Sequence, residues 1–236
     1  MKDTIIIESL FPEACNLFGD ISNISYLKKC LPNATFIDTS FHDELYCISH
    51  NVNMIYMGPM TEKMQEKAIE KLKPYKDKLK ELIEKNIVFL ITGNSLEIFE
   101  DYIENEDGSR IEGLGIFHLF AKRDMMHRHN SIFMGKYNDI EIVGFKSQFT
   151  FSYGENDNYY FSKAEKGIGI NPTTMLEGIN KNNFFCTYVI GAILILNPYF
   201  TKKILEKIGV DSSNIAFEEE VIKAYEQRIC EFKALK

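Results

Sequence analysis

The sequence predicts an α/β domain with a mostly parallel sheet, helices on both faces, and added β-strands. In the first half of the chain, short apolar runs alternate with helical patterns. Strands separated by helices need crossover connections, and these pair neighbouring strands in parallel. The second half changes to closely spaced β-rich runs, typical of antiparallel or mixed strands. The final stretch returns to helical periodicity.

The first half contains a regular succession of strands and helices. Its strands are expected at Thr4–Ser9, Thr35–Asp38, Met54–Met57 and Ile87–Ile91, and its helices at Ile21–Cys30 and Thr61–Lys85. The longer helical stretch has apolar residues near helical spacing, so one stripe faces the core and the lysines face solvent. Pro74 lacks the backbone donor that a helix interior needs, which predicts a kink or a break there.

The second half is expected to be β-rich and then helical. The β runs are Ile116–Ala121, Ser131–Tyr137, Ile140–Phe145, Met175–Ile179 and Phe184–Ile190. Helix Pro198–Ile208 has Asn197 as its expected N-cap, and Ser212 or Ser213 is expected to cap a helix ending at Ala234. Because no Pro/Gly/Ser-rich linker or repeat interrupts the chain, residues 1–236 are expected to form a single domain.

Composition excludes several classes of function. The 236-residue chain is 45% hydrophobic and carries a net charge of −7, which argues against nucleic-acid binding through the whole surface. No apolar run approaches the roughly 18–20 residues that cross a bilayer, and Ile5–Ile7 is too short for a signal peptide. The five scattered cysteines form no Cys-x-x-Cys pair. We therefore expect a cytoplasmic protein without disulfides, structural metal or cofactor.

Sites in open α/β sheets form outside the carboxyl ends of the strands. Three junctions occupy that position: Phe18–Asp20, Gly58–Met60 and Thr92–Ser95. The third, before a helix expected to begin near Leu96, resembles a nucleophile elbow with Thr92 in the nucleophile position. A threonine hydroxyl is a poor nucleophile without a base. We expect Thr92 and Ser95 to cap free amides of that helix instead.

The order of motifs resembles the glutamine amidotransferase family that includes cobyric acid synthase and the amidotransferase subunit of lipid II isoglutaminyl synthase. Leu10–Ile24 is close to the family's YPDLLNIYGDRGNI opening, and Glu112–Phe117 matches its GLGIL element. Gly144–Gln148 looks like a form of GFENH. Glu177–Ile179, Thr187–Gly191 and Asn197–Pro198 resemble the closing EG…GTYLHG…NP block. The matches run in order from residue 10 to about residue 208.

The residues that differ from the family pattern stand at the positions that carry its catalytic chemistry. The family elbow reads Cys-Gly-Gly-Tyr-Gln, whereas this chain has Thr92–Leu96. Ile190 stands where TYLHG carries the catalytic histidine. Gly58–Glu62 replaces the GGGQD segment, and Ser147-Gln148 replaces the last two residues of GFENH. The family's reaction passes through a thioester, which needs a thiolate and an imidazole. Backbone donors at Gly58 and Gly93 would stabilise a transition state only if a nucleophile were present to form one.

The leading hypothesis is a catalytically degenerate amidotransferase-like protein with a flavodoxin-like, class I glutamine amidotransferase-like fold. The resemblance implies a binding or regulatory subunit without glutaminase activity. Its partner would be a Mur ligase-like or other synthetase subunit, and its ligand a small amino-acid-like compound. The candidate pocket consists of Asp20, Gly58, Thr92, Gly93, Asn94, Ser95, Arg128, Gln148 and Tyr188.

Two alternatives remain open from the sequence. One is an enzyme of a different reaction class that reuses the pocket, with Thr92, Ser95, Asp20 or Arg128 in new roles. The other is an active amidotransferase subunit that uses a displaced cysteine such as Cys186. A cysteine within an apolar strand is more typical of a packing role.

Two polar clusters and one aromatic segment complete the candidates. His127–His129 is either an anion-binding cluster or a solvated loop, and strand spacing places the two histidines opposite Arg128. The family has a substrate-carboxylate arginine in this stretch. Cys47 lies within Phe41–His50, a polar loop or short strand with incidental His, Asp and Glu neighbours. The aromatic residues of 149–161 form either sheet packing or a contact face: Phe149, Phe151, Tyr153, Tyr159, Tyr160 and Phe161.

Overall fold

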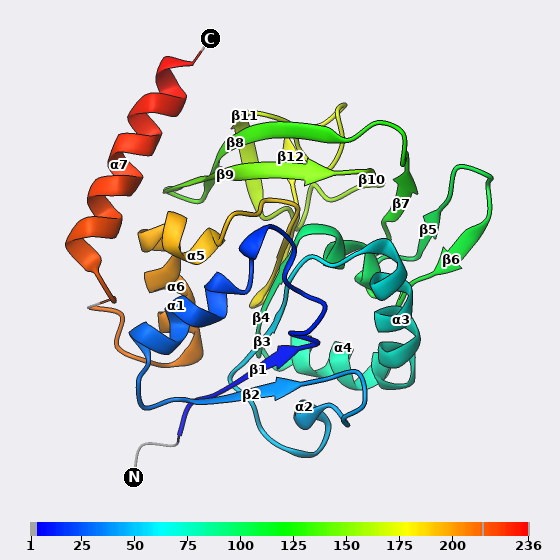
Figure 1. Cartoon of the computed structure of the whole chain (residues 1–236), viewed down its shortest axis with the longest axis horizontal. Coiled ribbons are helices and arrows are strands. Elements are labelled where there is room, and N and C mark those ends of the chain that lie inside the picture. Colours follow the sequence, from blue (N-terminus) through cyan, green and yellow to red (C-terminus); the bar gives the residue numbers. More distant parts are fainter. Residues whose placement is uncertain (1–3, 214, 236) are drawn as a thin grey trace.

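A computed structural model gives the structure of residues 4–213 and 215–235. Its centre is a six-stranded sheet in the order β13-β14-β4-β3-β1-β2 (Figure 1). Its strands are β1 (Ile6–Leu10), β2 (Thr35–Thr39), β3 (Met54–Met57), β4 (Val88–Thr92), β13 (Ile179–Lys181) and β14 (Phe184–Thr187). Neighbouring strands are parallel except β13 and β14, which are antiparallel. The prediction of a mostly parallel sheet is confirmed.

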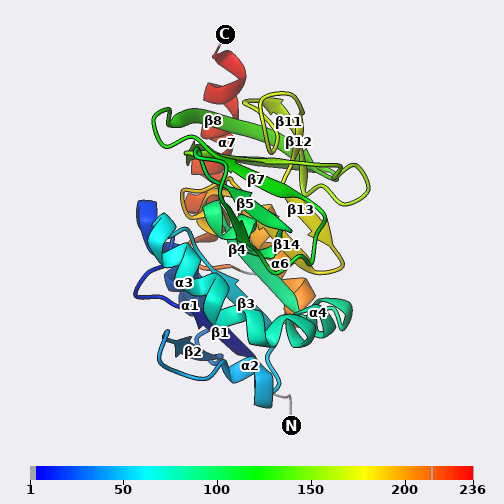
Figure 2. The same cartoon turned by 90° about the vertical axis from the view of Figure 1, so that its right-hand side faces the viewer.

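Helices cover both faces of this sheet, as predicted. The helices are α1 (Ser22–Cys30), α2 (Tyr46–Ser49), α3 (Glu62–Leu72), α4 (Lys76–Glu84), α5 (Ile193–Leu196), α6 (Pro198–Ile208) and α7 (Glu218–Ala234). Along β3, Met54 and Tyr56 join the core beneath α1 and α6, while Ile55 and Met57 join the core beneath α3 and α4. Alternate side chains of a strand point to opposite faces, so this strand is buried on both sides. Figure 2 shows α3 and α4 on one face.

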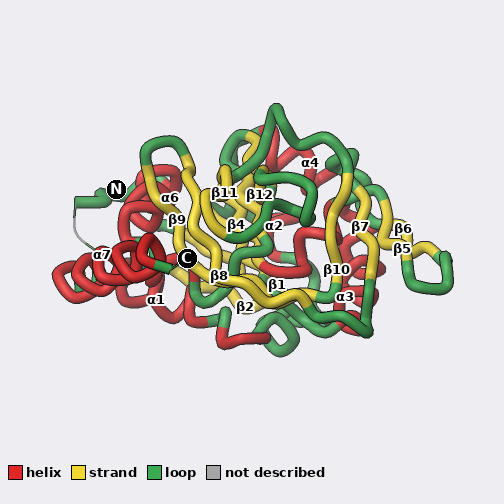
Figure 3. The backbone as a smooth tube through the Cα atoms, turned by 90° about the horizontal axis from the view of Figure 1, so that it is seen from above, coloured by secondary structure: helices red, strands yellow, loops and turns green. Residues whose placement is uncertain are grey.

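The added strands form two further four-stranded sheets, ordered β10-β7-β5-β6 and β12-β11-β8-β9. Their bounds are β5 (Tyr102–Glu104), β6 (Arg110–Glu112), β7 (Phe120–Arg123), β8 (His129–Tyr137), β9 (Ile140–Gln148), β10 (Thr150–Tyr153), β11 (Ser162–Lys166) and β12 (Leu176–Glu177). Viewed from above in Figure 3, α7 lies at one end of the molecule and the β5–β6 hairpin at the other. The β8–β9 hairpin lies above the central sheet in Figure 1.

The break predicted at Pro74 is present, because a 3-10 turn at Lys73–Tyr75 separates α3 from α4. The helix predicted to begin near Leu96 is a 3-10 helix, η3, spanning Gly93–Phe99. It starts directly after β4, so the elbow is tighter than expected. Gly93 occupies a positive φ of 60°, a conformation that glycine adopts without steric penalty.

Several predictions for the second half are wrong in detail. Residues 116–119 are not a strand, because the Ile116 and Phe117 amides both donate to the Phe99 carbonyl. The strand predicted to reach Ile190 stops at Thr187, since the Tyr188 amide donates to a Glu177 side-chain oxygen. The β5–β6 hairpin, β10, β11 and α5 were not predicted from periodicity. These elements have three to five residues, and the strands among them lack the continuous apolar run that marks the equally short buried strands β3 and β4.

Asn197 occupies the predicted N-cap position of α6, followed by Pro198, whereas the cap predicted at Ser212 or Ser213 is wrong. Asn197 makes no capping side-chain bond to α6. Its Oδ1 instead accepts from the Val143 amide at 2.7 Å, and its Nδ2 donates to the Val143 carbonyl at 2.8 Å, which ties α6 to β9. The last helix begins at Glu218 with Phe217 before it, so Ser212 and Ser213 lie outside its first turn. Three glutamates occupy that turn, where negative charge is favourable.

A fully buried ion pair joins the added strands to the central sheet. Lys146 of β9 pairs with Glu177 of β12, and both side chains have no exposed surface. The Lys146 ammonium also donates to the Gly169 carbonyl at 2.6 Å. Glu177 accepts from Thr187 and from the Tyr188 amide, each at 2.8 Å. Burial lowers the pKa of Lys146, and the Glu177 carboxylate opposes that shift.

Replacing one partner of this pair should destabilise the fold strongly. Lys146→Ala leaves the Glu177 charge buried without its counter-ion, and we expect a loss of about 3–5 kcal/mol in the free energy of unfolding. Lys136→Ala is the matched control, because its pair with Glu165 is exposed and contributes less than about 1 kcal/mol. Urea denaturation measures both variants. Equal losses would refute the role of the buried pair.

Candidate functional site

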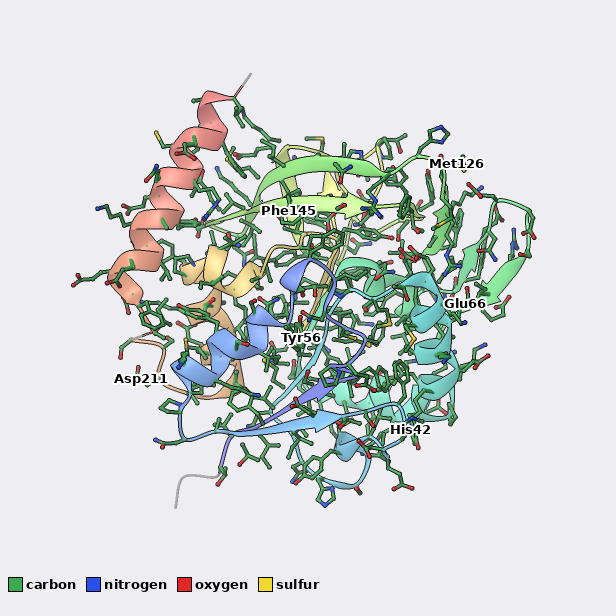
Figure 4. The ribbon with its side chains drawn as sticks, in the orientation of Figure 1. His42, Tyr56, Glu66, Met126, Phe145 and Asp211 are labelled. Carbon is green, nitrogen blue, oxygen red and sulfur yellow. The ribbon has the colours of Figure 1, made fainter. Side chains whose placement is uncertain are left out.

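A cavity of about 200 Å³ lies at the carboxyl ends of β1, β3 and β4. Its walls come from the three predicted junctions and from the segment around the end of β9: Leu17, Phe18, Pro59, Met60, Thr61, Glu62, Gly93, Asn94, Glu97, Arg128, Ser147, Gln148, Phe149, Thr150, Tyr188 and Ile190. Figure 4 labels Tyr56 on β3, within the sheet below this region, and Phe145 on β9 above it. The fold therefore brings distant segments of the chain to one site.

The predicted pocket residues separate into two groups. Those that line the cavity are Gly93, Asn94, Arg128, Gln148 and Tyr188. The others lie behind its wall and are buried: Asp20, Gly58, Thr92 and Ser95. The residue in the nucleophile position therefore does not face the cavity.

Thr92 is held by a buried carboxyl group. Its hydroxyl donates to Asp20 Oδ2 at 2.5 Å, and the same oxygen accepts from the Tyr56 hydroxyl at 2.7 Å. Asn23 Nδ2 donates to it at 3.1 Å. Burial raises the pKa of Asp20, and these donors oppose the rise. Thr92 does occupy the N-cap position of η3, but its side chain makes no hydrogen bond to the amides of that helix.

The neighbouring junctions are fastened to each other by side-chain bonds. Ser95 Oγ donates to the Gly58 carbonyl at 2.6 Å, so Ser95 is not a helix cap either. Asn94 accepts from the Met60 amide at 3.0 Å and donates to the Met60 carbonyl at 2.8 Å. Pro59 has no amide hydrogen. The Pro59-Met60 part of this loop consequently offers no free amide to a developing oxyanion.

Ile190 forms the wall opposite Asn94. Its backbone pairs with Phe145 of β9, with its amide donating at 2.9 Å and its carbonyl accepting at 3.4 Å. A side-chain carbon of Ile190 lies 3.4 Å from the place that a Cβ on Gly93 would occupy. A saturated hydrocarbon thus lies beside the elbow, and it cannot transfer a proton.

Arg128 reaches the cavity from the segment before β8. Its guanidinium lies over the Phe149 ring, 4.3 Å from the ring centre. His127 precedes the strand in a turn and bonds Asp124 at 2.9 Å, whereas His129 begins β8 and bonds Ser131. The prediction that the two histidines share one strand face is wrong, since only His129 belongs to the strand.

Glu97 is a site residue that sequence reasoning missed. It is buried, lines the cavity, and accepts from Gln65 Nε2 at 2.8 Å and from the Tyr188 hydroxyl at 3.1 Å. Gln65 in turn accepts from Arg123 at 2.7 Å. Burial raises the pKa of Glu97 to about 7, against the opposing effects of Gln65, Arg123 and Tyr188. Its signal in the sequence is a single acidic residue between apolar neighbours, Leu96 and Ile98.

Among the residues that the structure describes, no thiol or imidazole lines this cavity. Cys186 is buried on β14, where burial raises the pKa of its thiol well above the ordinary value. Cys47 lies in the short helix α2, which replaces the predicted loop or strand. Within residues 4–213 and 215–235, no three His, Cys, Asp or Glu side chains gather as a metal site. The helices of that same part of the chain include none long and apolar enough to cross a membrane.

Comparison with protein-family models gives no match. Among curated proteins, the chain is similar to the lipid II isoglutaminyl synthase (glutamine-hydrolyzing) subunit GatD of Streptococcus pneumoniae. The two are 24% identical over 231 residues, which cover 90% of this chain and 85% of that protein. The resemblance predicted from the motifs is thereby confirmed.

Solved structures share the fold. PurLQS from Thermotoga maritima has a TM-score of 0.54 at 10% identity, covering 96% of this chain and 100% of that chain. A glutamine amidotransferase has a TM-score of 0.57 at 9% identity, covering 86% and 99%. A second, from Thermotoga maritima, has a TM-score of 0.52 at 11% identity, covering 95% and 93%. The chain therefore has the class I glutamine amidotransferase fold.

The raised pKa of Glu97 predicts a pH-dependent stability. The protonated form is favoured in the folded state, so its contribution is complete below the ordinary pKa of 4.5 and is lost as pH rises to about 7. Glu97→Gln should remove a decline on the order of 3 kcal/mol across that window. Urea unfolding at several pH values measures it, with exposed Glu84→Gln as control. Identical pH profiles for wild type and Glu97→Gln would contradict the assignment.

Proposed function

We propose that this chain, which has the glutamine amidotransferase fold, is a catalytically inactive subunit of amidotransferase type without glutaminase activity. Its role is to bind a partner and a small amino-acid-like ligand. The observation that carries the proposal is the pairing of the buried Thr92 hydroxyl with Asp20, opposite a wall formed by Ile190. Neither residue supplies the thiolate or the imidazole that thioester formation needs.

The partner of this proposal is a synthetase subunit, of Mur ligase-like type. The similar protein from Streptococcus pneumoniae is itself named as a subunit, which supports a shared mode of action. Apolar side chains are exposed beside the cavity: Leu17 at 36%, Phe18 at 44% and Phe145 at 37%. The Phe18 and Phe145 rings meet edge to face with centres 6.2 Å apart. Exposed aromatic groups are favoured at protein contacts.

The competing enzyme hypotheses have less support from the site. The Thr92 hydroxyl is buried and is not among the groups that line the cavity, so its pairing with Asp20 presents no nucleophile to a ligand there. A displaced-cysteine reaction through Cys186 lacks an accessible thiolate, because that side chain is buried and its pKa is raised.

An ammonia-release assay with saturating L-glutamine tests the proposal. We expect wild type, Thr92→Ala and Cys186→Ala all to release no ammonia above the protein-free blank, because no thiol of the described residues lines the cavity. Release by wild type that Cys186→Ala abolishes would establish the displaced-cysteine reaction. Release that Thr92→Ala abolishes would establish hydrolysis through threonine. Either result overturns the inactive-subunit proposal.

A further inference from the structure

A second hollow of the molecule lies between α6, α7 and the turn that joins β8 to β9, and its volume is about 720 Å³. We call it the α6–α7 groove. Figure 1 shows α7 beside the end of the β8–β9 hairpin, away from the carboxyl ends of the central strands. None of the residues that line the groove also lines the cavity. The groove is therefore a separate surface.

The uncharged part of the groove lining is aromatic and aliphatic. Tyr199 is 41% exposed, and its ring meets the Tyr225 ring edge to face with centres 5.5 Å apart. The Tyr225 hydroxyl donates to the Glu141 carbonyl at 2.7 Å, which fixes the position of that ring. Half-buried Ile140 and Ile229 complete this part of the lining. Exposed aromatic surface of this kind is favoured at protein contacts.

Both lysines of the groove lining are already neutralised. Lys203 pairs with Glu206 at 2.9 Å, and Lys202 pairs with Glu218 in the first turn of α7 at 2.6 Å. These two ammonium groups therefore offer no uncompensated positive charge to an anion.

Two carboxylates of the groove lining have no counter-ion. Glu141 pairs with Lys233 at 2.6 Å. Asp139 in the β8–β9 turn and Glu226 on α7 are exposed, and among the described residues neither lies within 4.0 Å of a positively charged side chain. The uncompensated charge of the groove is negative. It repels phosphate and carboxylate groups and attracts cationic ones.

The negative surface continues along α7. An adjoining hollow shares Glu226, reaches back to Glu218 and Glu219 at the start of the helix, and contains one lysine, Lys223. From Glu218 to Ile229 the helix rises about 17 Å, at about 1.5 Å per residue. An extended chain covers that length with about five residues. A strip of this length fits a peptide segment better than a single small cation.

We propose that the α6–α7 groove docks an extended segment of a partner protein that combines arginines with apolar residues. Guanidinium groups pair with carboxylates, here Asp139 and Glu226, and also stack on aromatic rings such as that of Tyr199. The apolar residues of the segment pack against Ile140 and Ile229. This docking surface goes beyond the proposed function and is independent of it, because it uses no residue of the cavity.

Calorimetric titration of the whole protein with capped peptides tests the partner chemistry. The probes are acetyl-Leu-Arg-Leu-Leu-Arg-amide and its counterparts with glutamine or glutamate in place of arginine. We expect the arginine peptide to bind roughly 10-fold more tightly than the glutamine peptide, from two exposed ion pairs of about threefold to fivefold each, and the glutamate peptide not to bind. An ionic strength of about 1 M should remove most of this preference, because exposed charges are screened. No binding of the arginine peptide, or equal binding of the arginine and glutamine peptides, would overturn the proposal.

Variants matched in charge locate the docking site. Asp139→Asn combined with Glu226→Gln should weaken the arginine peptide roughly 10-fold and leave the glutamine peptide unchanged. Glu70→Gln combined with Glu84→Gln makes the same change in net charge at exposed positions outside the groove, and should bind like wild type. Equal weakening by the two double variants would indicate attraction to the net charge of the protein and would refute the assignment to the groove.

A second copy of the chain is the competing occupant, because its segment 71–80 carries five lysines. Sedimentation velocity of the wild-type protein over a range of concentrations separates the two occupants. We expect no self-association, which supports a partner protein. Self-association that is abolished by combining Asp139→Asn with Glu226→Gln would assign the groove to a second copy and overturn the proposal.

Discussion

The Asp20 carboxyl group is the point on which the geometry of the site depends. It follows β1 and takes hydrogen bonds from Tyr56 on β3, Thr92 at the end of β4, and Asn23 in α1. Asn23 also accepts from the Leu194 amide of α5 at 2.9 Å, which extends the network to the closing block. The three donors all reach its Oδ2, and hydrogen bonds to a carboxyl group offset part of the cost of burying it. The same bonds that secure the sheet therefore withdraw the threonine hydroxyl from the cavity.

The polar and charged groups around the cavity fall into two sets. In the first set, Gln65 connects Arg123 to the cavity residue Glu97, and the hydroxyl of Tyr188 connects Glu97 to Ser152, which lies 2.7 Å away. These groups are hydrogen-bonded to one another and stabilise the fold. At the cavity surface, Glu62 and Arg128 have no such partners among the described residues. The second set is therefore available to bind a ligand, while the first set holds the cavity wall in place.

Elements set off by a clear apolar run or by a helix-breaking residue were predictable from the sequence, whereas several strands of the added sheets were not. β3 and the interruption of the α3–α4 stretch at Pro74 follow from local periodicity and from the missing proline donor. The three junctions were found because parallel strands present their carboxyl ends at one edge. The orientation of Thr92, the role of Asn197 and the contribution of Glu97 depend on partners distant along the chain. Such side-chain partners leave no periodic trace in a single sequence.

The backbone attachment of Ile190 has a consequence for evolution, because the side chain at this position can change without a change in the fold. Main-chain bonds to Phe145 hold this position, so its placement does not depend on which side chain it carries. An exchange at such a point can abolish a reaction while the surrounding scaffold stays intact. Selection can then keep the fold for binding after catalysis has been lost, and few substitutions separate the two states.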